Sequence, residues 1–286
     1  MKIKEIIIAL KPVNWFKGAF MVLIGILNTR LLLGIGRVAN NIFIGLPTYF
    51  LISISMMLTV LIFKISSESS ENTLKNVRRI GFFLGITYLI SYSLSIYYVI
   101  VLNLNYLSLF IVALIGVFLL ISIYYKRDWE KKSLLVHVIE SLSYSFGIIY
   151  GGVLNTLMIP IYIYLFFAAA FLTQFCKDII TSYKYVAKDR VKNELSFPIT
   201  FGIQKTQQVA FILELIIILS LLLPLFIDIY NAIMYLIPMI FMLVIFGVIS
   251  FLTLKLDLEH KYRRFMNLLF KAGIFFEILA FILASF

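Results

Sequence analysis

The chain has 286 residues, of which 62% are hydrophobic, and its mean hydropathy is +1.03. Soluble domains average roughly 45–50% apolar residues, so this composition excludes a soluble globular domain and predicts a protein that crosses the membrane several times. The net charge of +11 does not require a nucleic-acid partner, because basic loops beside anionic membrane lipid account for it.

Runs of roughly 17–25 apolar residues between polar breaks predict transmembrane helices. In chain order they cover residues 13–33, 42–63, 80–102, 104–125, 135–157, 159–177, 207–227, 231–254 and 265–286. The fifth and sixth runs meet near Pro160, and drawing them differently leaves eight helices in place of nine. Backbone in lipid must satisfy its own hydrogen bonds, so we expect an all-α bundle of nine helices that forms one domain, residues 1–286.

The basic residues indicate the orientation of this bundle. Of the 25 basic residues, 23 fall in the N-terminus and in the loops after the second, fourth, sixth and eighth helices, all on one side. Arg30 and Arg37 lie on the other side. The positive-inside rule places the N-terminus and the charged loops in the cytoplasm. The Ile-, Lys- and Asn-rich residue usage fits an AT-rich prokaryote, and we expect the protein in the cytoplasmic membrane of such a cell.

The loop after the sixth helix is the segment in which residues suited to catalysis or ligand binding are concentrated. Asp178 and Asp189 lie there among six basic residues between Lys177 and Lys205. Carboxylates and cations at a membrane surface suit a metal and a phosphate. The alternative is that Asp178 pairs with Lys177 or Lys184 at a solvated helix end.

This segment resembles the second aspartate-rich motif of the UbiA family of intramembrane prenyltransferases. The resemblance rests on Lys177-Asp178-Ile179, on Asp189-Arg190 and on the tail 197–202 (FPITFG). Three further segments are similar to family motifs: Leu10-Lys11-Pro12-Val13-Asn14, Tyr125-Lys126-Arg127 and Tyr150-Gly151-Gly152. The resemblance implies the nine-helix fold with the charged loops on the cytoplasmic side.

The resemblance also implies a chemistry. In the family, two aspartate-rich loops hold Mg²⁺ on the diphosphate of a prenyl donor, and a lipophilic acceptor captures the prenyl cation. By resemblance, Asp178 and Asp189 are catalytic metal carboxylates. Arg78, Lys126, Lys131 and Lys132 are expected to clamp the diphosphate, and Asn14 to orient the donor.

The chain departs from the family pattern at both motifs. The first motif aligns with residues 63–80, where Lys64, Ser67 and Glu71 replace its three aspartates. Glu68 and Glu71 are three residues apart, share a helix face and offer a substitute carboxylate pair; the alternative is that both are solvated. In the second motif Thr181 replaces the middle aspartate. Asp189 lies eleven residues after Asp178, where the family spacing is seven.

Four more polar residues are candidates. His137 falls where many relatives carry asparagine, and it is either a ligand or a histidine at the membrane interface. Glu140, Glu214 and Glu277 lie in or near apolar runs, where carboxylates are usually functional. Each is alternatively paired with a base or protonated.

We therefore expect Mg²⁺-dependent transfer of a polyprenyl group from its diphosphate to a lipophilic acceptor, such as a quinone precursor or a glycerol-phosphate lipid. The first alternative is an inactive homologue that binds isoprenoids or a membrane partner, because half of the expected carboxylates are replaced. The second alternative is a transporter that uses the intramembrane glutamates as proton relays.

Overall fold

The structure is a computed structural model. It describes residues 12–30, 35–66, 71–102, 106–124, 133–156, 158–182, 186, 197–227, 229, 231–255 and 260–286, with the side chains covered over slightly shorter ranges at several helix ends. The regular elements in these ranges are all helices. This confirms the prediction of an all-α membrane protein.

Nine long helices lie within the described residues, and each overlaps one predicted span. Their bounds are α2 (Pro12–Thr29), α3 (Ile35–Ser66), α4 (Glu71–Leu102), α5 (Tyr106–Tyr124), α7 (Ser133–Asn155), α8 (Ile161–Ser182), α11 (Ile203–Leu222), α12 (Ala232–Lys255) and α13 (His260–Leu283). A short helix, α10 (Phe197–Phe201), and a 3₁₀ turn, η3 (Leu223–Phe226), complete the described elements.

Six of the helices are long and apolar enough to cross a membrane, and two more apolar helices, Phe16–Thr29 and Tyr106–Ile121, are shorter. The described residues fall into two compact units. The first unit holds residues 1–130 and 142–159, and the second holds residues 131–141 and 160–286, so α7 begins in the second unit and ends in the first. The single domain expected from the sequence stays a prediction.

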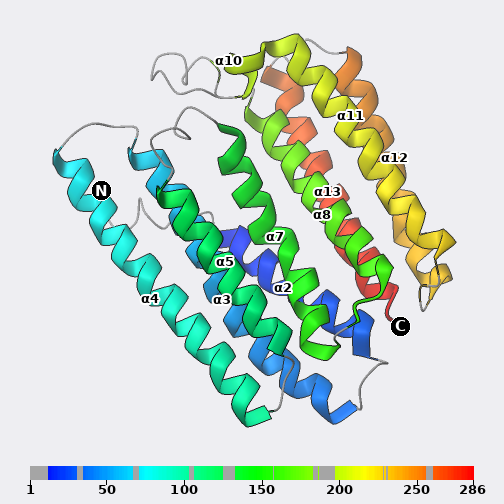
Figure 1. Ribbon diagram of the computed structural model, residues 1–286. Coiled ribbons are helices and arrows are strands. Elements are labelled where there is room, and N and C mark those ends of the chain that lie inside the picture. Colours follow the sequence, from blue (N-terminus) through cyan, green and yellow to red (C-terminus); the bar gives the residue numbers. More distant parts are fainter. Residues whose placement is uncertain are drawn as a thin grey trace. The chain divides into compact units, whose positions relative to one another are not determined.

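In the first unit, α3 packs against α2, α4 and α5, and α4 also packs against α5 (Figure 1). The contact between α3 and α4 is an apolar cluster of buried side chains: Met57, Leu58, Leu61, Ile62, Ile80 and Leu84. Aliphatic side chains one turn apart on each helix supply a continuous stripe, as helix pairing requires.

Glycines bring α2 and the C-terminal part of α7 into backbone contact. A Cβ added at Gly25 would lie 2.2 Å from the carbonyl oxygen of Ile148, and one added at Gly151 would lie 2.2 Å from that of Val22. Small residues let membrane helices approach this closely. The Gly151-Gly152 pair noted in the sequence therefore belongs to a helix–helix contact.

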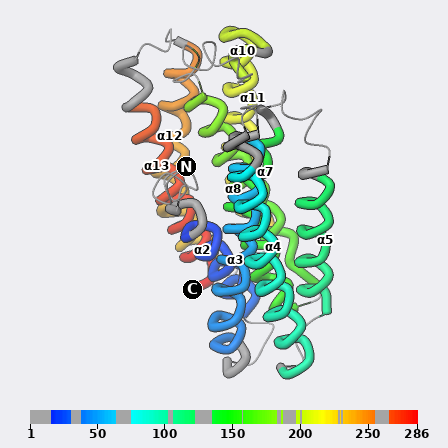
Figure 2. The backbone as a smooth tube through the Cα atoms, turned by 90° about the vertical axis from the view of Figure 1, so that its left-hand side faces the viewer, coloured from blue at the N-terminus to red at the C-terminus, as the bar shows by residue number. Residues whose placement is uncertain are grey.

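In the second unit, α8 packs against α11 and α13, and α12 packs against α11 and α13. Figure 2 shows α12 and α13 running side by side. The core contains a stack of buried aromatic rings in which Phe166 of α8 lies 5.6 Å from Tyr235 of α12 and 4.2 Å from Phe281 of α13, between ring centroids. This stack joins three helices of the unit.

Helix α8 is longer than the sequence predicts, and this changes the setting of Asp178. The predicted span ends at residue 177, whereas α8 continues to Ser182. Asp178 is therefore a helical residue and only 5% exposed. The interpretation of Asp178 as a solvated helix end is wrong, because the apolar residues Ile179 and Ile180 continue the helix into the core.

Candidate functional site

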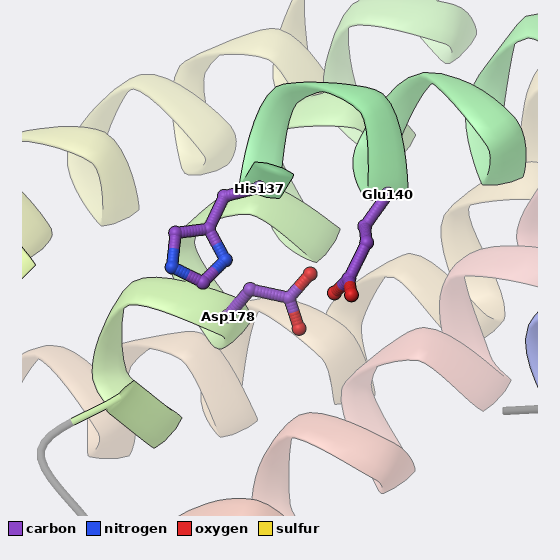
Figure 3. A group of neighbouring side chains, drawn as sticks. All are labelled: His137, Glu140 and Asp178. Carbon is purple, nitrogen blue, oxygen red and sulfur yellow. The ribbon is translucent and has the colours of Figure 1, made fainter. Parts of the chain in front are cut away.

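Three side chains that can bind a metal converge in the second unit. His137 and Glu140 come from the start of α7 and Asp178 from the last turns of α8, and one potential ligand atom from each lies within 4.8 Å of the other two. Figure 3 shows the imidazole and both carboxylates pointing toward one another. We call these three residues the HED cluster.

The local sequence explains how α7 contributes two of the three groups. Residues three apart on an α-helix are neighbours on one face, so His137 and Glu140 both point toward α8. Glu140 is buried, with 1% of its surface exposed, and His137 is partly exposed. The cluster therefore has a closed side at Glu140 and Asp178 and a more open side at His137.

Hydrogen bonds hold Asp178 in place. The amide Nε2 of Gln174, one turn earlier on α8, donates to Oδ2 of Asp178 at 2.9 Å. Lys177 donates from Nζ to Oε1 of the same glutamine at 3.5 Å. Gln174 is itself buried, so this bond is formed away from bulk water. A buried carboxylate oriented in this way is prepared to act as a ligand.

The close approach of the two carboxylates favours a compensating positive charge in the cluster. Two carboxylates that lie close together in a buried site disfavour each other's ionised form, and a cation or a proton between them relieves the repulsion. Divalent cations bind readily to carboxylate oxygens. The described residues thus fit a divalent metal, with Glu140 and Asp178 as oxygen ligands and His137 as a nitrogen ligand.

The described part of the structure covers only some of the site residues expected from the sequence. Asp178 is in the cluster and Arg78 is exposed on α4 of the first unit. Asn14 and Glu71 lie in described helices, but their side chains fall outside the described residues. Asp189, Glu68, Lys126, Lys131 and Lys132 also lie outside them. Roles for these residues stay predictions.

In the sequence, His137 and Glu140 are separate candidates. Their spacing of three residues at the start of one helix is the signal that could have joined them, and Asp178 is not visible as their partner until α7 and α8 are packed. Gln174 has no distinctive sequence signal, apart from lying one turn before Asp178.

The other two intramembrane carboxylates in the second unit have hydroxyl partners. Thr253 donates from Oγ1 to Oε1 of Glu214 at 2.9 Å, and Thr173 donates from Oγ1 to Oε1 of Glu277 at 3.2 Å. Both glutamates are fully buried. They lie outside the HED cluster and offer matched buried carboxylates for comparison with it.

The sequence itself matches no protein-family model and no curated protein. Solved structures do match. A digeranylgeranylglyceryl phosphate synthase is 18% identical with a TM-score of 0.74, and the alignment covers 97% of this chain and 96% of that one. A UbiA homologue from Archaeoglobus fulgidus, bound to DMAPP and Mg²⁺, is 13% identical with a TM-score of 0.62, covering 97% of this chain and 98% of that one. The chain therefore has the fold of the UbiA-type prenyltransferases over nearly its whole length.

Proposed function

We propose that the protein transfers a polyprenyl group from a prenyl diphosphate to a lipophilic acceptor within the membrane, with the help of a divalent metal ion. The observation that carries this proposal is the HED cluster, with its two buried carboxylates, in a chain with a UbiA-type fold. The cluster includes Asp178, the aspartate of the motif-like segment Lys177-Asp178-Ile179. The match to a UbiA homologue bound to DMAPP and Mg²⁺ supports the choice of substrate class.

The chemistry assigned to the chain's own residues is simple. Asp178 and Glu140 provide anionic oxygens for a cation that also binds the diphosphate. Such a cation, when bound, stabilises the charge that develops on the departing diphosphate. The allylic carbon–oxygen bond breaks with its electron pair going to the diphosphate. The acceptor then forms the new bond to carbon and loses a proton.

A stripe of aromatic rings on α8 supports an isoprenoid substrate. Phe167, Phe171 and Phe175 follow one another at one-turn spacing, with ring centroids 6.2 Å and 5.8 Å apart. All three rings are partly buried. Phe171 is seven residues, or about two turns, before Asp178 and so lies on nearly the same side of α8. These rings offer an apolar wall for a prenyl chain whose diphosphate lies at Asp178.

The proposal also keeps the expected orientation, with the N-terminus and the charged loops on the cytoplasmic side of a prokaryotic cytoplasmic membrane. The acceptor is proposed as a class, a quinone precursor or a glycerol-phosphate lipid. In this orientation the basic loops would meet a diphosphate that arrives from the cytoplasm.

The experiment that tests the function measures diphosphate release from geranylgeranyl diphosphate by the purified protein in detergent. A panel of quinone precursors and glycerol-phosphate lipids is offered, with Mg²⁺ or with a chelator. We expect release that needs the metal and an acceptor. Asp178→Asn should abolish release, whereas Glu214→Gln, the same change at a buried carboxylate outside the cluster, should retain it.

Two other results would point away from prenyl transfer. If folded protein binds geranylgeranyl diphosphate but releases nothing with any acceptor, the chain is an isoprenoid-binding homologue. If it neither binds nor releases, and a transport assay responds to Glu277→Gln but not to Asp178→Asn, the transporter alternative holds.

A further inference from the structure

We propose that His137, Glu140 and Asp178 form a binding site for one divalent first-row transition metal ion, such as Mn²⁺, Fe²⁺, Co²⁺ or Zn²⁺. The inference goes beyond the proposed function, because it concerns which ion this chain selects, and metal binding is measured without any prenyl substrate.

The choice of metal follows from the kinds of atom in the cluster. Mg²⁺ is a hard cation that binds oxygen ligands in near-ideal octahedral geometry and keeps several waters. Imidazole nitrogen suits zinc, copper, iron and nickel, whereas carboxylates suit magnesium, calcium and manganese. A set of one imidazole and two carboxylates combines both ligand types, so it favours a transition metal over Mg²⁺. An ion with three protein ligands also keeps positions open for water or a phosphate oxygen.

The spacing of the three side chains suits a shared ion. Metal bonds to histidine nitrogen and carboxylate oxygen are about 2.0–2.2 Å long, so two ligand atoms of one ion lie at most about 4.4 Å apart. The potential ligand atoms of the HED cluster lie within 4.8 Å of one another. Side-chain rotations that move the atoms by a fraction of an ångström bring all three to bonding distance, without any shift of α7 against α8 within the second unit.

The surroundings hold the ligands in position. Gln174 donates to Oδ2 of Asp178 and so restricts that carboxylate to one orientation. Glu140 lies inside α7 and is almost fully buried, which limits its movement as well. Hydrogen bonds from outside the metal's own ligands are a regular feature of protein metal sites.

A site without metal is the rival arrangement. Here His137 would be an imidazolium that balances the two carboxylates directly, with its proton in the place of the ion. The two arrangements differ in a measurable way, because only the first binds a transition metal at this position.

The test uses the full chain, purified in detergent and stripped of metal with a chelator. Co²⁺ is titrated in, and its visible absorption reports the number of ions and their ligands. Mn²⁺ binding is followed by electron paramagnetic resonance, with Mg²⁺ as competitor. The variants are His137→Asn, His137→Gln and Glu140→Gln, and the controls are Glu277→Gln and Glu214→Gln, which alter buried carboxylates elsewhere in the same unit.

We expect one Co²⁺ per chain, displaced only by a large excess of Mg²⁺. Loss of an outer hydrogen-bond partner alone costs about 10–100-fold in metal affinity, so replacing His137 or Glu140 should weaken Co²⁺ binding by at least about that much. His137→Asn should also change the Co²⁺ spectrum, because a nitrogen ligand is lost. Glu277→Gln and Glu214→Gln should bind Co²⁺ as the unaltered chain does.

Absence of Co²⁺ and Mn²⁺ binding by protein that elutes as a folded species would overturn the proposal, as would wild-type affinity in the folded His137 and Glu140 variants. These results are separate from the fate of the proposed function. Cobalt binding that needs His137, without diphosphate release, leaves the metal site standing and rejects prenyl transfer. Mg²⁺-dependent diphosphate release that is unchanged in His137→Asn, together with an absence of cobalt binding, supports prenyl transfer and rejects the transition-metal site.

Discussion

Gln174 and Asp178 lie one turn apart on α8, and Nε2 of the glutamine donates a hydrogen bond of 2.9 Å to Oδ2 of the aspartate. Both side chains are buried, at 1% and 5% exposure, so water does not compete for this bond. The bond is made to Oδ2, and it restricts the orientation of the whole Asp178 carboxylate. Gln174 is thus a positioning residue for the HED cluster.

Replacing Gln174 by leucine should weaken metal binding without removing a ligand. Gln174→Leu keeps a side chain of comparable bulk but cannot donate to Asp178, and we expect the affinity for Co²⁺ to fall about 10–100-fold. The titration described for the HED cluster measures this. Gln208→Leu is the matched control, because Gln208 is exposed on α11 of the same unit. Equal affinity in both variants would show that the bond does not position Asp178.

The aromatic stripe on α8 gives a prediction for the prenyl chain. Truncating the half-buried ring in Phe171→Ala should cost about 1 kcal/mol of apolar contact, or roughly a fivefold loss in affinity for geranylgeranyl diphosphate. Affinity for inorganic diphosphate, which has no chain, should not change. Phe226→Ala serves as control, since that ring is 84% exposed in η3. An equal loss of affinity for geranylgeranyl diphosphate and for inorganic diphosphate would show that the Phe171 ring does not contact the prenyl chain.

Apolar run length was enough to predict the helices, because lipid imposes its thickness on each span. Each of the nine predicted runs overlaps a long helix. The helix ends were less predictable, because α4 begins at Glu71 and α8 ends at Ser182, both beyond the apolar runs. Polar residues such as Asn76 and Thr181 continue a helix once its backbone hydrogen bonds are formed. Hydropathy does not detect that extension.

The candidate site was less predictable than the fold. A family resemblance identified Asp178 as a carboxylate of interest. The sequence could not show that its partners in the described structure are His137 and Glu140, some forty residues earlier. Long-range contacts of this kind depend on how α7 and α8 face each other. Spacing along each helix is visible in the sequence, whereas the facing of two helices is set by packing.

The close contact of α2 with α7 predicts a strong effect of one methyl group. A Cβ at Gly151 would lie 2.2 Å from the carbonyl oxygen of Val22, a backbone atom that cannot move independently. Gly151→Ala should therefore destabilise the protein by about 1–3 kcal/mol, as overpacking does. Thermal unfolding in detergent measures it.

The control for this substitution is Gly85→Ala in α4 of the same unit, where an added Cβ meets nothing within 4 Å. Alanine is the better helix former, so this variant should be unchanged or slightly more stable. If both variants unfold at the same temperature, α2 and α7 do not pack as closely as the structure has them.

Gly202 tests the backbone of the motif-like tail that precedes α11. Its φ of 83° and ψ of 156° lie in a region that residues with a Cβ rarely adopt, and an added Cβ would meet nothing within 4 Å. Any destabilisation in Gly202→Ala therefore comes from backbone strain, which costs about 1–3 kcal/mol. Gly247→Ala in α12 is the matched control, since its Cβ also meets nothing and its backbone is helical. Thermal unfolding should separate the two variants, with only Gly202→Ala less stable. Equal stability would mean that the turn between α10 and α11 adopts another conformation.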